Sequence, residues 1–104
     1  MIARKFLIPL RKEYFKIRRT GRWFRTPFFD LIICSNNLGY GRFAFVVSTK
    51  VSNLSVTRHK IKRLLSGICQ GLKIDKDLVF IAKREIVDAN KAKIENEINR
   101  LISN

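Results

Sequence analysis

The spacing of apolar positions is helical in the first part of the chain. Residues 11–20 place Tyr14, Ile17 and Arg18 on one side, at intervals of three and four residues. Gly21 follows directly, and glycine is a typical residue at the end of a helix. The pattern therefore predicts a helix over 11–20 that ends at Gly21.

The next segments change to a composition that favours strands. Residues 23–34, interrupted at Pro27, are rich in aromatic and β-branched side chains. Residues 35–41 contain Asn and Gly, which adopt turns readily. Residues 43–48 are predominantly apolar and predict a further strand at the centre of a sheet. Together these segments predict a meander of antiparallel strands.

A second helical pattern covers residues 54–72. One face of this helix carries aliphatic side chains at Leu54, Ile61, Leu65, Ile68 and Leu72, with Leu64 further round. Asn53 or Ser55 could cap the start of the helix, and Gly71 could end it. The aliphatic stripe predicts that this face is buried.

The remaining pattern predicts a short strand and a final helix. Residues 78–82 are apolar throughout, and residues 87–102 are amphipathic at helical spacing. The inward positions of the final helix are Ile94, Ile98, Leu101 and Ile102. Two Lys–Glu pairs on its solvated face are spaced by four residues, Lys91–Glu95 and Lys93–Glu97. This order of elements indicates an α+β or α/β sandwich.

Composition adds a strong positive charge to this picture. The 104 residues suit one domain over 1–104, and 22 Lys and Arg against 8 Asp and Glu give a net charge of +14. Residues 1–63 hold 15 of the basic and 2 of the acidic residues, and ten of the eleven aromatic residues lie at or before Phe45. Nucleic acid is therefore the expected partner of the first part of the chain.

Cysteine and histidine usage excludes several classes of protein. Cys34 and Cys69 are the only cysteines and His59 is the only histidine, and these residues do not have the spacing of zinc ligands. Both cysteines lie among apolar residues, which predicts buried free thiols and a reducing, cytoplasmic location. No apolar stretch approaches the ~20 residues of a membrane span, and residues 6–10 are too short for a secretory signal. A basic surface anchor at the N-terminus is the weaker alternative, so we expect no membrane partner.

The acidic residues do not predict a catalytic centre. Magnesium-dependent nucleases need clustered carboxylates, yet the basic part contains only Glu13 and Asp30. The later acids are spread along the final helix and its entry, where a solvated face is the simpler explanation. We therefore expect no catalytic residue, no metal site and no small-molecule substrate, and no bond-breaking by the protein itself.

The second predicted helix carries a dense basic run. Five potential hydrogen-bond donors occupy six positions beside the aliphatic stripe, namely Arg58, His59, Lys60, Lys62 and Arg63. Such a run is often only a solvated face. Here, however, no acid lies between Asp30 and Asp75 to neutralise it, so phosphate binding is the favoured interpretation.

The aromatic residues of the first part allow two interpretations. Six of them lie in predicted strands, where at least half are expected to be buried: Trp23, Phe24, Phe28, Phe29, Phe43 and Phe45. Tyr14 lies among basic residues of the first helix, which suits a groove for single-stranded RNA. It could equally be the apolar anchor of that helix on the sheet, and the residues alone leave both readings open.

One segment resembles the signature of the bacterial ribonuclease P protein component: FAFVVSTKVSNLSVTRHKIKRLL, residues 43–65. In that family an apolar strand ends in Val-Ser-x-Lys, and a helix with Val-x-Arg-Asn-Arg-x-Lys-Arg follows. The segment EYFKIRRTG also resembles the family's first helix, and DLVFIAKRE its fourth strand, so the similarity covers nearly the whole chain. Three positions depart from the pattern: His59 replaces Asn, Ser66 replaces a frequent Arg, and Arg18 replaces a second aromatic residue.

The resemblance implies a fold and a function. Members are α+β proteins of order α-β-β-β-α-β-α, a two-layer sandwich with a central, mostly antiparallel sheet. Their βαβ crossover through the basic helix is left-handed, against the usual preference. They bind a catalytic RNA that, with Mg²⁺, removes the 5′ leader from precursor tRNA. The basic helix lies against the RNA subunit, and a cleft between the first helix and the sheet holds the leader.

Roles for individual residues follow from the resemblance. Contacts to the RNA subunit are expected from Arg58, His59, Lys60, Lys62 and Arg63. Contacts to the leader are expected from Arg11, Tyr14, Arg18, Ser48 and Lys50. A ribosomal or other structured-RNA-binding protein without processing activity would explain the charge equally well, and a DNA-binding module is a third possibility. Only the joined strand-and-helix signature favours the ribonuclease P component over these alternatives.

Overall fold

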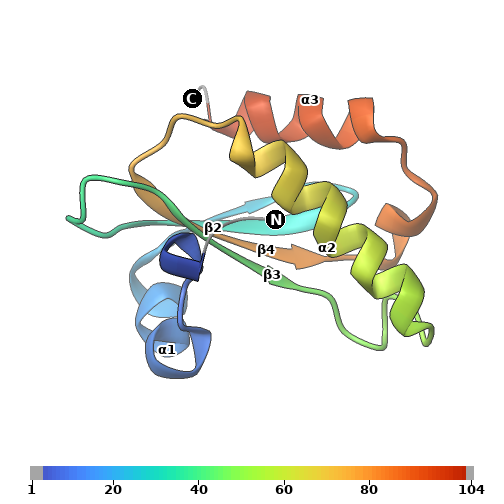
Figure 1. Cartoon of the computed structure of the whole chain (residues 1–104), viewed down its shortest axis with the longest axis horizontal. Helices are drawn as coiled ribbons and strands as arrows, with labels where there is room; N and C mark the ends of the chain where they lie inside the picture. Colours follow the sequence, from blue (N-terminus) through green and yellow to red (C-terminus); the bar gives the residue numbers. More distant parts are fainter. Residues whose placement is uncertain (1–3, 103–104) are drawn as a thin grey trace.

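The computed structural model describes residues 4–102, which form three α-helices, four β-strands and two short 3₁₀ helices (Figure 1). In chain order the elements are η1 (Arg4–Phe6), α1 (Leu10–Thr20), β1 (Arg22–Arg25), β2 (Phe29–Ser35), β3 (Arg42–Val46), α2 (Ser55–Gln70), β4 (Lys76–Ala82), η2 (Arg84–Asp88) and α3 (Lys91–Ile102). The α+β class and the order α-β-β-β-α-β-α are the predicted ones.

The four strands form one sheet in the order β1-β2-β4-β3. β1 pairs with β2, and β2 with β4, in antiparallel orientation, whereas β3 pairs with β4 in parallel. The predicted meander is therefore wrong beyond the first hairpin. The central position predicted for residues 43–48 is also wrong, because β3 lies at the edge and β4, buried over residues 77–80, occupies the interior of the sheet.

β3 is apolar although it is not a central strand, because its outer edge is covered. The N-terminal segment runs along the outer edge of this strand, where the Ile8 amide donates a hydrogen bond to the Phe43 carbonyl oxygen at 2.9 Å. Leu7 also forms a bridge with Phe43, whose side chain is buried. An edge strand that is covered in this way needs the same apolar residues as a central one.

β3, α2 and β4 form the predicted βαβ crossover. The two strands are parallel neighbours, and α2 connects them across one face of the sheet (Figure 1). Viewed with α2 in front and both strands pointing upward, β4 lies to the left of β3. The crossover is therefore left-handed, which is the uncommon sense for this motif.

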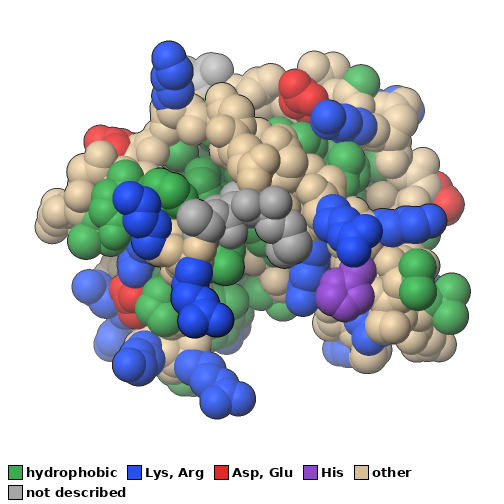
Figure 2. Space-filling view, in the orientation of Figure 1, with side chains coloured by type: hydrophobic (Ala, Val, Ile, Leu, Met, Phe, Trp, Pro, Cys, Tyr) green, Lys and Arg blue, Asp and Glu red, His purple; other side chains and the backbone are tan. Residues whose placement is uncertain are grey.

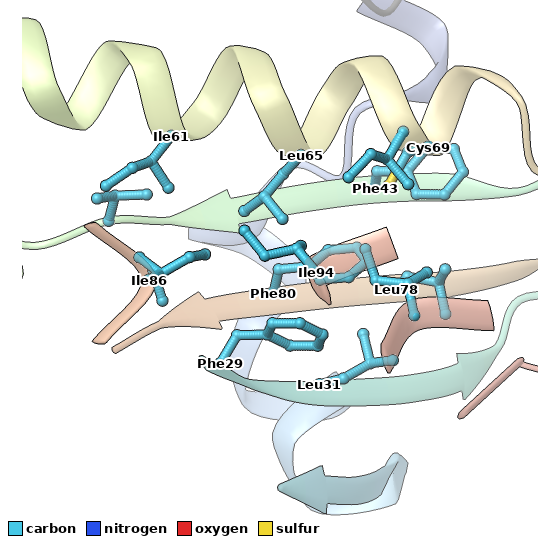
Figure 3. Packing of buried hydrophobic residues seen from close by; sticks show 14 of the residues in the cluster. Phe29, Leu31, Phe43, Ile61, Leu65, Cys69, Leu78, Phe80, Ile86 and Ile94 are labelled. Atoms are coloured by element: carbon cyan, nitrogen blue, oxygen red, sulfur yellow. The ribbon is translucent and has the colours of Figure 1, made fainter. Parts of the chain in front are cut away.

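The main core lies between the sheet and the two helices α2 and α3 (Figure 3). Phe80 of β4 is at its centre, with ring centroids 5.5 Å from Phe29 of β2 and 5.6 Å from Phe45 of β3. α2 contributes Ile61 and Leu65, which are 5% and 0% exposed. This helix-on-sheet packing fixes which side of α2 faces solvent.

α1 lies against the opposite face of the sheet (Figure 1). Ile17 is its fully buried side chain, and it packs into a second cluster with Ile32, Ala44 and Val79 from three strands. Gly21 allows α1 to end close to β2, because a Cβ atom there would lie 2.5 Å from Ile32 Cγ2. The sheet with α2 and α3 thus forms the predicted two-layer sandwich, and α1 covers part of its other face.

The structure differs from the predictions at the starts of two helices and in one ion pair. Leu54 precedes α2 and is 66% exposed, so it does not belong to the buried stripe. The final helix begins at Lys91 rather than at residue 87, because the Asn90 side chain accepts a hydrogen bond from the Lys93 amide at 2.9 Å and caps the helix start. In the described residues Glu97 pairs with Arg100, at 2.6 Å, instead of with Lys93.

The aromatic and cysteine predictions are partly confirmed. Of the six strand aromatics, Phe29 and Phe43 are buried, which is fewer than the predicted half. Three others are partly buried against the core, and Trp23 is 39% exposed. Cys34 and Cys69 are buried free thiols, as expected. Burial raises the pKa of the Cys69 thiol to about 12, so this group is neutral and unreactive near pH 7.

Candidate nucleic-acid interface

The basic run of α2 faces solvent because the aliphatic positions of the same helix are anchored in the core. Ile61, Leu65 and Ile68 are buried at helical spacing, and the cationic residues occupy the turns between them. His59, Lys60 and Arg63 are exposed, whereas Arg58 and Lys62 are half-buried. The five residues predicted to bind the RNA subunit therefore lie on and beside one exposed helix face.

Arg58 has a structural partner that the sequence did not reveal. Its guanidinium Nη1 donates a hydrogen bond to the Ser52 carbonyl oxygen at 2.8 Å. This bond ties the start of α2 to the loop of residues 47–54, which carries Ser48 and Lys50. Arg58 thus has its side chain partly engaged within the protein, and only part of its donor capacity faces outward.

The cations of α2 lack acidic partners in the described residues. Within 4–102, every ion pair of a Lys or Arg side chain with a carboxylate involves Arg42, Lys83 or Arg100. Like charges three or four residues apart on a helix destabilise it by about 0.2–0.5 kcal/mol per pair, which a bound polyanion would relieve. The arrangement is electrostatically suited to phosphate groups.

A second cationic surface lies on α1. Arg11 and Arg18 are exposed on this helix, and Tyr14 between them is half-buried. Ile17, rather than Tyr14, is the fully buried anchor of α1 on the sheet. Because these residues follow one another at three- and four-residue spacing, Arg11, Tyr14 and Arg18 share one side of the helix, as predicted.

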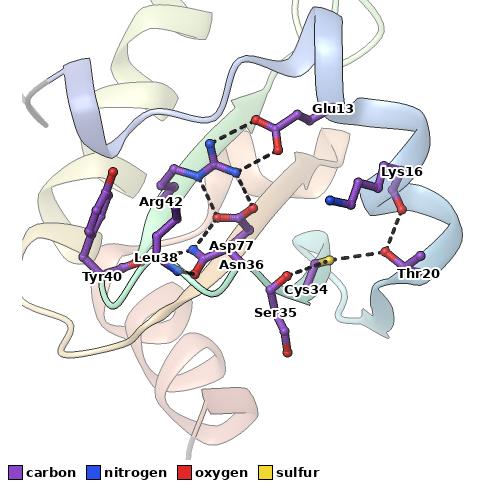
Figure 4. Close-up of polar contacts among 10 residues, drawn as sticks. All are labelled: Glu13, Lys16, Thr20, Cys34, Ser35, Asn36, Leu38, Tyr40, Arg42 and Asp77. Atoms are coloured by element: carbon purple, nitrogen blue, oxygen red, sulfur yellow. Dashed lines mark hydrogen bonds and ion pairs between the residues drawn. The ribbon is translucent and has the colours of Figure 1, made fainter.

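A partly buried ion network holds α1 in place (Figure 4). The Arg42 guanidinium at the start of β3 donates two hydrogen bonds to Glu13 of α1, both at 3.0 Å, and two to Asp77 of β4, at 2.9 and 2.7 Å. The Asn36 amide donates a further bond to Asp77 at 2.8 Å. The hydrogen bonds that Arg42 donates to Asp77, and then those to Glu13, raise the pKa of Arg42 above its already high value.

This network was missed by sequence reasoning, although the chain contains a signal for it. Glu13 is the only acid in a helix of basic residues, and Asp77 directly precedes the apolar run of residues 78–82. Acids in such positions need a partner when they are buried, and Asp77 is 2% exposed. The network fixes the position of α1, and with it the side of the helix that carries Tyr14.

An open groove borders α1 on the sheet. Val46 of β3 and Ile81 of β4 are register partners on the α1 face of the sheet and are only partly buried. Figure 2 shows a hollow between α1, at the lower left, and the start of α2 with its preceding loop, at the lower right. Ser48 and Lys50 are exposed in that loop. The structure thus places both groups of predicted leader contacts on the borders of one hollow.

A separate, open pocket lies elsewhere on the molecule. A cavity of about 860 Å³ is lined by residues that include Phe6, Tyr40, Leu72 and Ile74, at the opposite end of the sheet from the loop of residues 47–54. None of the ten residues predicted to contact RNA lines it. Among residues 4–102 no group of three or more His, Cys, Asp and Glu side chains could hold a metal ion, and no helix is long and apolar enough to cross a bilayer.

Comparison with known proteins gives this surface its context. The family model for ribonuclease P matches residues 3–104. The chain belongs to the ribonuclease P protein family. It is 30% identical over 105 residues to the ribonuclease P protein component of Thermoanaerobacter sp. strain X514, covering 95% of this chain and 90% of the relative. It is 33% identical over 95 residues to that of Alkaliphilus metalliredigens, covering 88% and 85%.

Solved ribonuclease P proteins share the fold. A Staphylococcus aureus RNase P protein mutant with defective mRNA degradation activity superposes with a TM-score of 0.84 at 23% identity, covering 95% of this chain and 86% of the other. The RNase P protein of Thermotoga maritima gives a TM-score of 0.81 at 19% identity, covering 91% and 93%. Membership of the ribonuclease P protein family makes this chain an RNA-binding component of an endoribonuclease holoenzyme in tRNA processing.

The three departures from the family pattern lie in different environments. His59 is exposed on α2 and Arg18 is exposed on α1, so both can meet a ligand. Ser66 is 3% exposed and points its hydroxyl at the Arg63 carbonyl oxygen at 3.4 Å. The basic run of α2 in this ribonuclease P protein therefore ends at Arg63.

Proposed function

We propose that this ribonuclease P protein binds the RNA subunit through α2 and the 5′ leader of precursor tRNA through the groove beside α1. In this proposal the RNA subunit, with Mg²⁺, carries out the cleavage. The observation that carries the proposal is a pair of cationic surfaces on either side of one hollow, in a chain of this family (Figure 2). The buried free thiols Cys34 and Cys69 support assembly in the reducing cytoplasm.

α2 is assigned to the RNA subunit because the rigid helix holds its cationic side chains on one exposed face. A rigid helix with exposed Lys60 and Arg63 presents cations at a constant spacing, which suits the regular phosphates of a structured RNA. His59 directly precedes Lys60, in the place of the family's Asn, and its imidazole can donate a hydrogen bond. Lys62 and Arg58 flank the same face.

The groove beside α1 is assigned to the leader because it is open, partly apolar and bordered by donors. Val46 and Ile81 give it an apolar floor, and Tyr14 offers a ring on which an unpaired base can stack. Arg11 and Arg18 provide cations on the α1 side. Single-stranded RNA has exposed bases and phosphates, so it can use both kinds of surface.

The cleavage chemistry is assigned to the RNA because the protein offers no suitable set of acids. Glu13 is bound to Arg42, and Asp30 lies 3.0 Å from the Lys83 ammonium, so both acids of the basic part already have cationic partners. Mg²⁺ prefers clustered oxygen ligands, and it would be held by RNA phosphates in the holoenzyme. Residues of the protein bind and orient the substrate.

Reconstitution with the cognate RNA subunit tests the proposal. Protein alone should leave 5′-labelled precursor tRNA uncut, and protein with RNA and Mg²⁺ should release the leader. A structured RNA of equal length, used in place of the RNA subunit, should give no cleavage. Cleavage by RNA-free protein that is lost in Asp30→Asn or Glu13→Gln would contradict the assignment of the chemistry.

A matched pair of double variants tests the assignment of α2. Lys60→Ala/Arg63→Ala removes two exposed cations from α2, and Lys91→Ala/Lys93→Ala removes the same charge from α3. Each lost phosphate contact should lower the salt dependence of RNA-subunit binding by about one unit of slope. The α2 variant should therefore lose about two units while the α3 variant changes little. Equal losses in both would show that only net charge matters.

A further inference from the structure

Phe15 is a large apolar side chain that the fold does not use. It is 76% exposed on α1, the highest value among the exposed large hydrophobic residues of the described part. Ile17 anchors the helix, and Phe15 belongs to neither core cluster. A single exposed apolar residue needs no explanation by itself, so its surroundings decide whether it has a role.

The ring of Phe15 lies beside that of Tyr14. The two ring centroids are 6.1 Å apart, with an angle of 59° between the planes. Successive residues of an α-helix are about 100° apart around its axis, so Phe15 lies further from the sheet than Tyr14. The two rings therefore form a continuous aromatic surface that leads from the edge of the groove onto the outer side of α1.

Cations surround Phe15 on every neighbouring turn. The residues three and four positions before and after it, which are its neighbours on the helix surface, are Arg11, Lys12, Arg18 and Arg19. All four are exposed. The only acid of α1, Glu13, lies on a different side of the helix and is held by Arg42. An uncompensated positive field is thus centred on this ring.

Charge complementarity favours a nucleic acid as the occupant of this surface. A protein partner would have to remove water from four cations around a single apolar ring, and the centres of protein interfaces are depleted of charge. A strand of RNA meets both features together, because its base stacks on the ring and its phosphates pair with the cations. Single-stranded RNA is the form whose bases are free to stack.

We propose that Phe15 is a second base-stacking platform, which extends the path of single-stranded leader from the groove at Tyr14 over the outer side of α1. This inference rests on the proposed function of the groove. It adds a contact outside the groove, and it predicts that nucleotides further toward the 5′ end of a long leader contribute to affinity through Phe15. Arg11, Lys12 and Arg19 bind the phosphates that flank the stacked base.

A leader-truncation series with the reconstituted holoenzyme tests this contact. Affinity is measured for cleavage-resistant precursor tRNAs whose leaders are shortened one nucleotide at a time from the 5′ end. Phe15→Ala should weaken binding of the long leaders about five- to tenfold, the lower part of the range for base–aromatic stacking, and leave short leaders and mature tRNA unchanged. Phe15→Trp should retain the affinity for long leaders, and Phe15→Leu should not, because only a π surface stacks on a base.

Controls separate this inference from the proposed function and from other occupants. Leu38→Ala removes another exposed apolar side chain, 44% exposed, from the segment between β2 and β3, and should have no leader-dependent effect. Loss of affinity in Tyr14→Ala at every leader length, together with no effect of Phe15→Ala, would overturn the Phe15 contact alone. No leader dependence in either variant would overturn the groove as well. If Phe15→Ala also weakened the binding of mature tRNA, Phe15 would contact the RNA subunit and the inference would be overturned. If Phe15→Ala changed the sedimentation of the free protein, Phe15 would contact a second copy of the chain, which would overturn the inference as well.

Discussion

Arg42 is the residue whose replacement should show how strongly α1 is held on the sheet. Its side chain is 13% exposed and links Glu13 of α1 to Asp77 of β4. Arg42→Met removes the guanidinium and keeps a long unbranched side chain in its place. The Asp77 side chain, 3% exposed, would then retain only the Asn36 amide among the donors seen in the network.

The size of the effect follows from the burial of Asp77. Removing one partner of a buried ion pair costs about 3–5 kcal/mol, because the other charge is left without compensation. In a domain of about 100 residues each kcal/mol lowers the melting temperature by about 4–8 °C, so Arg42→Met should melt at least about 12 °C lower. Glu13 is 28% exposed and can be hydrated, so Glu13→Gln should cost only about 1 kcal/mol.

Urea unfolding followed by circular dichroism measures both variants. A third variant, Arg42→Met/Asp77→Leu, replaces the buried pair by apolar side chains and should be more stable than Arg42→Met alone, since no charge is left buried. A loss below about 1 kcal/mol in Arg42→Met, or a double variant weaker than the single one, would refute this account. Glu13→Gln should also weaken leader binding while it keeps the fold, because α1 carries Tyr14 and loses its tether.

Three further predictions concern single side chains. Tyr14→Ala should weaken binding of precursor tRNA by about 1–3 kcal/mol and leave mature tRNA unaffected, measured as two affinities with the holoenzyme; equal losses would make Tyr14 a structural anchor. Arg58→Ala should cost about 1 kcal/mol of folding stability as well as RNA affinity, because it also loses the bond to Ser52, and an unchanged melting temperature would show that this bond contributes nothing. Burial raises the pKa of the Cys69 thiol to about 12 in the folded state, whereas the thiol of the unfolded chain ionises above about pH 9. The contribution of this thiol to the free energy of unfolding is therefore complete below pH 9. Above pH 9 it falls by up to about 1.4 kcal/mol per pH unit. The stability difference between the natural protein and Cys69→Ala should therefore shrink between pH 8 and pH 11 in urea titrations, and a constant difference would contradict the burial of this thiol.

The helices and strands could be predicted because their signals are local. The helix expected over residues 11–20 is α1, and the stripe of Ile61, Leu65 and Ile68 is the buried face of α2. Pairing of the strands could not be predicted in the same way. The apolar residues of β3 are consistent with a central strand, and only the cover of its edge by Leu7 and Ile8, far away in the chain, explains them.

The candidate site was predictable to the extent that charge and helical spacing determine it. The positions of Lys60 and Arg63 follow directly from the period of the helix that carries them. The exposure of Leu54 could not be inferred, because it lies just before α2, where the helical period no longer applies. The brace from Arg58 to Ser52 and the network of Arg42 depend on loop and strand positions that no local pattern specifies.

The interior position of β4 sets a condition on folding during synthesis. β4 ends at Ala82 and is hydrogen-bonded on both sides, to β2 and β3, so neither of those strands has this partner until most of the chain has left the ribosome. Until then the nascent chain can form local helices and the β1–β2 hairpin, but β2 and β3 present unpaired edges. The positive charge already concentrated in the first 63 residues then acts as a solubility device, since copies on neighbouring ribosomes repel one another while the sheet is incomplete.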